Sequence, residues 1–222
     1  MAPWTLIFDL DGTLVDTIQD LGAALNGMLA ERGTAPLSSD EVRGMVGDGA
    51  RVLVDRALAA RGIVDGLETA LARFLALYAA APAVDSAVYP GVVETLEALM
   101  EAGHRLGICT NKPEAPSLDL LDALGLRRFF GSVVGGDTLP VRKPDPEPVR
   151  EARRRLGGGR AVMIGDSDND LLAGRAAGIP VVLVSYGYAR APVGTLGADR
   201  VIDHFGDLFS ALDGIFSSGD LG

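Results

Sequence analysis

The chain has only one cysteine, Cys109, among its 222 residues. A single cysteine excludes an intramolecular disulfide and a metal cluster held by several cysteines. This usage fits a reducing compartment, so we expect a cytoplasmic protein. Because Cys109 lies on an apolar stretch, we expect it to be a small buried hydrophobic residue. The two histidines, His104 and His204, lie far from the motifs described below, and we expect structural roles for both.

Positive charge and long apolar runs are also scarce. The chain has 20 lysines and arginines against 30 aspartates and glutamates, a net charge of −10. This charge argues against nucleic acid or an anionic membrane as the main partner. No apolar run reaches membrane-spanning length, and no basic region precedes the first one, so we expect no secretory signal. Neither His-Glu-x-x-His nor Gly-x-x-x-x-Gly-Lys occurs, which argues against zinc-peptidase and nucleotide-loop chemistry.

The first informative motif is a pair of aspartates directly after a short apolar run. Residues 6–8 are Leu-Ile-Phe and predict a buried strand, with Asp9 at its carboxyl end and Asp11 on the same side. Gly12 then lets the backbone turn. A divalent cation such as Mg²⁺ is the simplest compensation for two carboxylates held this close. Asp9 is also a candidate nucleophile and Asp11 a candidate general acid and base, whereas the alternative is a polar turn with two solvated aspartates.

The next part of the chain has helical spacing. Residues 16–32, 50–61 and 67–80 predict helices, and Ser38 and Glu41 are spaced as a capping box. We expect no strand between residues 15 and 81, so this block predicts a helical bundle.

From residue 90 onward, strands and helices alternate. Such alternation predicts an α/β fold with a Rossmann-like parallel sheet covered by helices on both faces. The opening strand has no nearby partner in sequence and most simply joins this later sheet. We therefore expect a core domain of residues 1–14 and 82–222, and an inserted helical cap domain of residues 15–81. The expected strands are residues 104–109, 132–135, 161–164, 180–184 and 200–202, and the expected helices are residues 91–102, 114–124, 145–156, 168–177 and 205–212.

Polar side chains follow three of these later strands. Thr110 and Asn111 end one strand, Lys143 follows another before a proline, and Asp166 to Asp170 end a third. Each of these groups alone has a simpler structural interpretation, as a helix cap, a surface lysine or a polar turn. Carboxyl ends of parallel strands meet at one edge of a sheet, where ligands bind. Together with Asp9 and Asp11, the groups therefore predict a site that handles phosphate and metal.

The combined motifs resemble the haloacid dehalogenase-like hydrolase superfamily, over nearly the whole chain. The superfamily motifs are Asp9-x-Asp11-Gly12-Thr13, Thr110-Asn111, Lys143-Pro144 and Gly165-Asp166-Ser167-x-x-Asp170. Further motifs are residues 46–50 and 52–54, Thr110-Asn111-Lys112-Pro113, Gly135-Gly136-Asp137, residues 143–148 and Tyr186-Gly187-Tyr188. With these, the chain is similar within the superfamily to the bacterial phosphoglycolate phosphatases.

This resemblance implies a role for each matched residue. Asp9 is expected to attack phosphorus, and Asp11 to act as general acid and then general base. Mg²⁺ is expected on the carboxylates of Asp9 and Asp166 and the backbone carbonyl of Asp11. The carboxylate at Asp11 separates the chain from the dehalogenases of the superfamily. The remaining expected roles are phosphoryl binding by Thr110, the Asn111 amide and Lys143, and orientation of water or Lys143 by Asp170.

The resemblance further implies a small phosphate ester as substrate, 2-phosphoglycolate first, under a lid hinged near residues 15–17 and 81–83. Arg43 and Arg51 of the cap are candidates for binding a substrate carboxylate, although a solvated helix face is the simpler interpretation. Gly47-Asp48-Gly49 follows no strand and is therefore not a dinucleotide loop. The alternatives are hydrolysis of a sugar phosphate, pyrophosphate or nucleoside monophosphate, phosphoryl transfer as in the β-phosphoglucomutases, and non-catalytic binding. We expect a monomer or homodimer.

Overall fold

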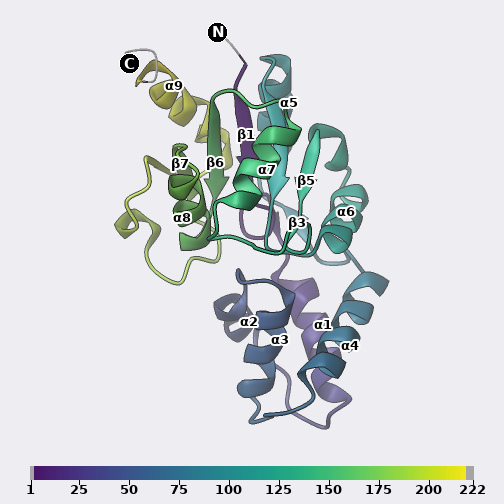
Figure 1. The fold of residues 1–222 in the computed structure, drawn as a ribbon. Helices are drawn as coiled ribbons and strands as arrows, with labels where there is room; N and C mark the ends of the chain where they lie inside the picture. The colour runs from purple at the N-terminus through teal and green to yellow at the C-terminus, as the bar shows by residue number, and fades with distance from the viewer. Residues whose placement is uncertain (1–2, 219–222) are drawn as a thin grey trace.

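The computed structural model describes residues 3–218 and places a six-stranded parallel sheet at the centre of the larger part of the protein (Figure 1). The opening strand, β1, pairs with β4 on one side and β6 on the other, so the expectation that it joins the later sheet is confirmed. In spatial order the strands are β5 (Ser132–Val134), β4 (Arg105–Cys109), β1 (Thr5–Phe8), β6 (Ala161–Gly165), β7 (Val181–Val184) and β8 (Arg200–Ile202).

The sequence of β1 explains its central position. Leu6, Ile7 and Phe8 have no exposed surface, because helices cover both faces of the sheet and both sets of alternating side chains are buried. Leu6 and Phe8 belong to one hydrophobic core and Ile7 belongs to the other. The carboxyl end of β1 is thereby held in the middle of the sheet edge where Asp9 follows.

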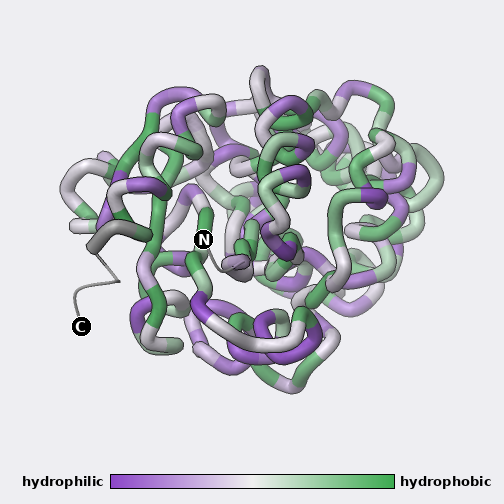
Figure 2. Tube along the Cα trace, turned by 90° about the horizontal axis from the view of Figure 1, so that it is seen from above, coloured by the Kyte–Doolittle hydropathy of each residue, from purple (hydrophilic) through white to green (hydrophobic). Residues whose placement is uncertain are grey.

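Helices of the core cover the two faces of the sheet. The core on the Phe8 face includes side chains of α5 (Val92–Glu101), α6 (Glu114–Ala123) and α9 (Leu208–Ser218), and the core on the Ile7 face includes those of α7 (Glu147–Arg155) and α8 (Asp168–Ala176). These helices carry both hydrophobic and hydrophilic residues (Figure 2), as expected for helices with one face on a core. Short 3₁₀ turns occur at Arg127–Phe129, Val193–Thr195 and Phe205–Asp207.

The expected helical block forms a separate bundle below the sheet (Figure 1). It has its own hydrophobic core, which includes Leu25, Leu53 and Phe74. The capping box is confirmed, since the Ser38 hydroxyl accepts from the Glu41 N–H and the Glu41 carboxylate accepts from the Ser38 N–H. The helices of the bundle are α1 (Ile18–Ala30), α2 (Ser39–Met45), α3 (Ala50–Ala59) and α4 (Leu67–Ala80).

The expectation of no strand between residues 15 and 81 is wrong. β2 (Val15–Asp16) pairs antiparallel with β3 (Ala87–Val88), and this two-stranded ribbon joins the two chain crossings between sheet and bundle. Two-residue strands carry no periodic signal, and this pair is defined only by a contact between segments far apart in the sequence. The second crossing is thus held at residues 87–88, beyond the hinge expected near residues 81–83. The division into residues 1–14, 15–81 and 82–222 stays a prediction.

Candidate active site

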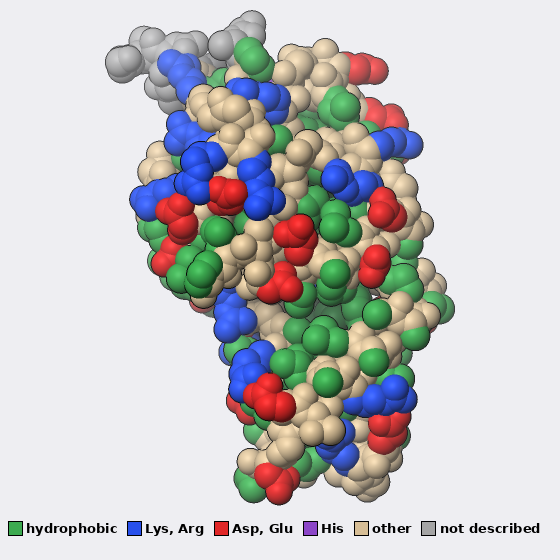
Figure 3. Space-filling model, turned by 45° about the vertical axis from the view of Figure 1, so that its right-hand side comes forward, with side chains coloured by type: hydrophobic (Ala, Val, Ile, Leu, Met, Phe, Trp, Pro, Cys, Tyr) green, Lys and Arg blue, Asp and Glu red, His purple; other side chains and the backbone are tan. Residues whose placement is uncertain are grey.

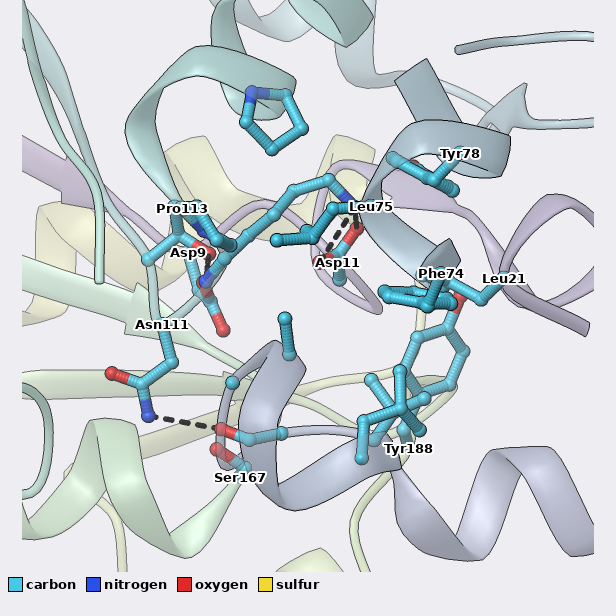
Figure 4. Close-up of a pocket in the computed structure, with 18 of the residues that line it drawn as sticks. Asp9, Asp11, Leu21, Phe74, Leu75, Tyr78, Asn111, Pro113, Ser167 and Tyr188 are labelled. Carbon is cyan, nitrogen blue, oxygen red and sulfur yellow. Dashed lines mark hydrogen bonds and ion pairs between the residues drawn. The ribbon is translucent and has the colours of Figure 1, made fainter. Parts of the chain in front are cut away.

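A pocket lies between the bundle and the carboxyl ends of the strands, where hydrophobic side chains gather at the waist of the molecule (Figure 3). Its core side carries polar groups, and its bundle side is mainly apolar (Figure 4). The lining residues from the core are Asp9, Asp11, Thr110, Asn111, Lys112, Pro113, Pro116, Asp166, Ser167 and Tyr188, and those from the bundle are Leu21, Val46, Gly47, Gly49, Ala50, Leu53, Phe74, Leu75 and Tyr78.

Asp9 lies directly after β1, as the sequence predicts. One carboxylate oxygen, Oδ1, accepts a hydrogen bond from the Leu10 N–H at 2.8 Å and lies 3.0 Å from the Lys143 ammonium. Burial raises the pKa of Asp9 to about 6, although the positive charge of Lys143 opposes the rise. The second oxygen, Oδ2, has no hydrogen-bond partner among residues 3–218 and is free to attack or to bind a cation.

Lys143 lies between two carboxylates. Its ammonium is 2.6 Å from Asp170 Oδ1 and 3.0 Å from Asp9 Oδ1, and its side chain is 1% exposed. Burial alone would lower the pKa of Lys143, but the two carboxylates hold that pKa above its ordinary value, so the ammonium stays charged. The second oxygen of Asp170 accepts from the N–H and hydroxyl of Ser167 at the start of α8. Asp170 therefore contacts both Lys143 and the start of α8, and its expected role in orienting Lys143 stays a prediction.

Asp9, Asp166 and Asp170 form a cluster suited to a divalent cation. Each offers a carboxylate oxygen, and the three oxygens lie within 4.8 Å of one another. Burial, followed by the charges of Asp170 and Asp9, raises the pKa of Asp166 well above its ordinary value. Three buried carboxylates against the single charge of Lys143 leave negative charge that a cation would neutralise. Both oxygens of Asp170 already accept hydrogen bonds, whereas Asp166 Oδ1 has no partner in the described chain.

Two glycines bring the backbone against Asp166. Gly12 has a φ of +82°, and a Cβ there would lie 2.4 Å from Asp166 Oδ2. A Cβ at Gly187 would lie 2.3 Å from the Asp166 Cβ. The same Oδ2 accepts the Tyr188 N–H at 2.5 Å. The turn after β1 and the segment after β7 therefore fix the direction of the Asp166 carboxylate, and only glycine permits their close approach.

Asp11 has two partners that the sequence did not identify. Asp11 Oδ1 accepts the Thr17 hydroxyl at 2.8 Å and lies 3.1 Å from the ammonium of Lys112. Lys112 is 7% exposed, and its ammonium lies 4.3 Å from the centre of the Tyr78 ring on α4. Lys112 was noted only as part of the Thr110–Pro113 motif. Lys112 could have been identified from its position next to Asn111, because the segment that follows β4 lies at the same edge of the sheet as Asp11.

Thr110 and Asn111 lie at the end of β4 beside Asp9, as expected. The Asn111 side-chain amide donates to the backbone carbonyls of Gly47 and Lys143, each at 2.9 Å, so it connects bundle and core (Figure 4). Because that nitrogen is already bonded, phosphate binding by the Asn111 amide would use the backbone N–H. Neither the Asn111 N–H nor the Asp11 N–H has a hydrogen-bond partner within residues 3–218. Such N–H groups bind phosphoryl oxygens well.

The two candidate arginines do not line the pocket. Arg51 pairs with Glu68 at 2.5 Å on the surface of the bundle. Arg43 lies 3.9 Å from Asp16, and its guanidinium is 5.0 Å from the centre of the Tyr188 ring. Arg51 thus lies on a solvated helix face, the simpler of the two interpretations, and Arg43 lies beside the ribbon.

Cys109 and the two histidines have structural surroundings. Cys109 is fully buried, and burial raises the pKa of its thiol to about 12, which keeps it protonated. His104 Nδ1 accepts the Trp4 N–H at 3.2 Å. His204 precedes the 3₁₀ turn at Phe205 and does not line the pocket.

The loop of residues 47–49 docks the bundle onto the core. Asp48 accepts hydrogen bonds from Asn169 at 2.8 Å and Arg190 at 2.6 Å, both in the core, and pairs with Arg56 of the bundle at 2.6 Å. Partial burial opposes ionisation, but these hydrogen bonds lower the pKa of Asp48 to about 2. The loop is therefore a contact between the two parts, consistent with its rejection as a dinucleotide loop.

An aspartate directly after the first strand of a parallel sheet, with a buried lysine and further aspartates at neighbouring strand ends, is the arrangement of one class of hydrolase. The chain belongs to the haloacid dehalogenase-like hydrolases, whose family model matches residues 5–178.

Named relatives cover nearly the whole chain. It is 51% identical to the phosphoglycolate phosphatase of Rhodospirillum rubrum, over 93% of this chain and 89% of the relative. It is 52% identical to the phosphoglycolate phosphatase of Caulobacter vibrioides, over 92% and 88%. A crystal structure of a predicted phosphoglycolate phosphatase from Haemophilus somnus superposes with a TM-score of 0.91 at 32% identity, over 96% of this chain and 99% of that one. Within residues 3–218, no helix is long and apolar enough to span a membrane.

Proposed function

We propose that this protein is a Mg²⁺-dependent phosphatase that hydrolyses 2-phosphoglycolate to glycolate and phosphate. The observation that carries the proposal is the pairing of Asp9 with the buried Lys143, and of Asp11 with Lys112, at one pocket that Asp9, Asp11 and Lys112 line. This arrangement gives a nucleophile, a proton-transfer group and two cations to an anionic ester. Relatives named for this activity, at 51% and 52% identity over nearly the full chain, support the named substrate.

In the first step Asp9 Oδ2 attacks phosphorus, and a new oxygen–phosphorus bond forms as the bond to the ester oxygen breaks. That oxygen takes a proton from Asp11 and leaves as the hydroxyl of glycolate. Negative charge on the phosphoryl oxygens grows during attack, and the Lys143 ammonium stabilises it together with the Thr110 hydroxyl and the Asn111 N–H. The product on the enzyme is a phosphoaspartate at Asp9.

In the second step a water molecule attacks the phosphoaspartate. Asp11, now a carboxylate, takes the proton from this water, and the bond between Asp9 and phosphorus breaks to release inorganic phosphate. One residue serves as acid and then as base, which returns it to its starting protonation state. The Thr17 hydroxyl and the Lys112 ammonium hold the Asp11 side chain in place in both steps.

Mg²⁺ would be held by the carboxylates of Asp9 and Asp166 and by the backbone carbonyl of Asp11. Bound there, the ion neutralises phosphoryl charge and keeps carboxylates and substrate together. Asp170 would not bind the ion directly, because one of its oxygens is hydrogen-bonded to Lys143 and the other to Ser167 at the start of α8.

The bundle of residues 15–81 would act as a cap that opens to admit substrate and closes to exclude bulk water. Its apolar side chains Leu53, Phe74 and Leu75 line the pocket opposite the carboxylates. A pocket that is closed in this way favours a small ester over a polymer.

The test is phosphate release from a panel of small phosphate esters, with Mg²⁺ and with chelator, for wild type and Asp9→Asn. The proposal requires 2-phosphoglycolate to lead the panel by orders of magnitude in kcat/KM. It also requires chelator and Asp9→Asn each to abolish release. Metal- and Asp9-dependent release with another ester in the lead would retain the mechanism and reject the substrate.

A further inference from the structure

The proposed substrate carries two anionic groups, but the site described so far accounts only for the phosphoryl group. Its carboxylate needs a partner of its own, because an unpaired charge in a mainly apolar pocket is costly. Among the residues that line the pocket in the described chain, Lys112 is the only lysine or arginine. This inference rests on the proposed function and concerns the part of the substrate that distinguishes phosphoglycolate from other esters.

The chemistry of the substrate limits where its carboxylate can lie. One methylene carbon joins the carboxylate to the ester oxygen, and that oxygen is the atom that Asp11 protonates. The carboxylate must therefore lie within a few bond lengths of Asp11. The Lys112 ammonium is 3.1 Å from Asp11 Oδ1 and 3.3 Å from Asp11 Oδ2, so it occupies this region.

Lys112 has the capacity to bind a second carboxylate. An ammonium group has three N–H donors, and the Lys112 ammonium makes two hydrogen bonds to the single carboxylate of Asp11, at 3.1 and 3.3 Å. At least one donor is therefore available. The position of the ammonium is fixed on its other side by the face of the Tyr78 ring, at 4.3 Å from the ring centre.

Tyr78 supplies an independent observation. Its residue is 2% exposed, and its hydroxyl is fully buried without a hydrogen-bond partner in the described structure. A buried hydroxyl of this kind costs stability unless something bonds to it. Tyr78 lines the same pocket from α4 (Figure 4), and its ring contacts the Lys112 ammonium, so a carboxylate bound beside that ammonium would also accept a hydrogen bond from the Tyr78 hydroxyl.

We propose that the Lys112 ammonium and the Tyr78 hydroxyl together bind the carboxylate of the substrate. Lys112 comes from the core and Tyr78 from the cap, so the substrate carboxylate would connect the two parts when the cap is closed. Specificity for a carboxylate-bearing ester would then come from one residue beside the catalytic acid and one on the lid.

The experiment compares kcat/KM for 2-phosphoglycolate and for ethyl phosphate, which keeps the ester and replaces the carboxylate by a methyl group. The readout is the ratio of the two values. Lys112→Met removes a charge-assisted hydrogen bond and should lower this ratio about 100-fold. Tyr78→Phe keeps the ring and removes only the hydroxyl, and should lower the ratio about 5-fold to 10-fold. Lys112→Arg should restore part of the preference lost in Lys112→Met.

Two control variants test rival cations. Arg142 lies against the backbone of Gly49 at the pocket edge and is exposed, and Arg51 is on the outer surface of the cap. Arg142→Met and Arg51→Met should each leave the ratio within about twofold, as for surface charges. A loss of preference in Arg142→Met, with preference retained in Lys112→Met, would overturn the proposal.

The outcomes separate this inference from the proposed function. A wild-type enzyme with no preference for 2-phosphoglycolate over ethyl phosphate rejects the proposed function itself. If the wild type prefers 2-phosphoglycolate and both Lys112→Met and Tyr78→Phe retain this preference, only the carboxylate site is rejected. If Lys112→Met lowers kcat/KM equally for both esters, Lys112 acts only through Asp11. This outcome also rejects the carboxylate site. The inhibition constant of inorganic phosphate, which has no carboxylate, should stay within about twofold in both variants and verifies that the site remains assembled.

Discussion

Asp170 Oδ1 lies 2.6 Å from the Lys143 ammonium, and neither side chain is more than 1% exposed. The other oxygen of Asp170 accepts from Ser167 and from the Asp166 N–H. A single carboxylate therefore contacts the lysine that we propose stabilises the phosphoryl group, and it also holds the turn that carries Asp166. Activity and stability are expected to depend on the same charge.

The first prediction concerns this charge. Asp170→Asn leaves an amide in place of the buried carboxylate, so Lys143 loses its nearest partner. We expect a loss of about 3 kcal/mol in unfolding free energy and at least a 100-fold drop in kcat, because the charge-assisted hydrogen bond to Lys143 is lost and Asp9 becomes the one carboxylate that still holds this lysine. Urea unfolding and steady-state kinetics measure the two effects. The matched control is Asp168→Asn, an exposed carboxylate two residues away, which should change neither appreciably.

The second prediction is a pH dependence of metal-free stability. The pKa of Asp9 is raised from 3.8 to about 6, mainly by burial, so the folded state holds a proton that the unfolded state releases. Stability contributed by this proton is present at pH 4 and is lost as the pH rises towards 6, about 3 kcal/mol in all. Unfolding in chelator should show a steeper loss of stability between pH 4 and pH 6 in wild type than in Asp9→Asn, where Asp166, whose pKa is also raised, still contributes. Identical slopes in both proteins would exclude the effect.

Stabilisation by a bound cation should depend on pH in the opposite direction, because it should grow as the pH rises. Mg²⁺ requires the ionised carboxylates of Asp9 and Asp166, so binding must release their protons at low pH. Stabilisation by Mg²⁺ should therefore grow as the pH rises through about 6. Thermal shifts with and without Mg²⁺, across this range, measure it.

Much of the fold followed from local sequence patterns, and the exceptions were contacts between distant segments. The regular alternation after residue 90 predicted the parallel sheet, and the apolar run before Asp9 predicted a central strand. The β2–β3 ribbon was missed because two residues, Val15 and Asp16, cannot show a period. The topology of a parallel sheet brings the carboxyl ends of its strands to one edge. Residues at these ends can therefore be predicted to lie together even where the bounds of a strand are not exact.

The site was predictable where a residue acts from its own strand end. Asp9, Thr110 and Asp166 lie where the spacing placed them. Lys112 and Tyr78 were missed because their meeting depends on how the bundle sits over the sheet, which no local pattern encodes. The same dependence explains why the cap arginines, chosen by charge alone, do not line the pocket.

The third prediction concerns docking of the cap. Arg190→Met removes a core partner of Asp48 and leaves the Arg56 contact within the bundle intact. We expect the open form to gain population, so KM should rise several-fold with a smaller change in kcat. Faster proteolysis of the residue 81–87 crossing is expected as well. Arg73→Met, which breaks an exposed ion pair with Glu31 within the bundle, is the control and should have neither effect.

The last prediction concerns the turn after Asp9. Gly12→Ala introduces a Cβ at a φ of +82°, 2.4 Å from Asp166 Oδ2 and 2.9 Å from the Tyr188 ring. Both the backbone strain and the contact are unfavourable, and the Asp166 side chain is the neighbour that must move. Mg²⁺ affinity should fall at least 10-fold, as measured by calorimetry, and kcat should fall with it. Gly33→Ala is the control, since its φ is +68° but no atom lies within 4 Å of the added Cβ. It should lower stability by about 1 kcal/mol without changing Mg²⁺ affinity. Equal losses of Mg²⁺ affinity in both variants would show that the turn acts through general stability rather than through Asp166.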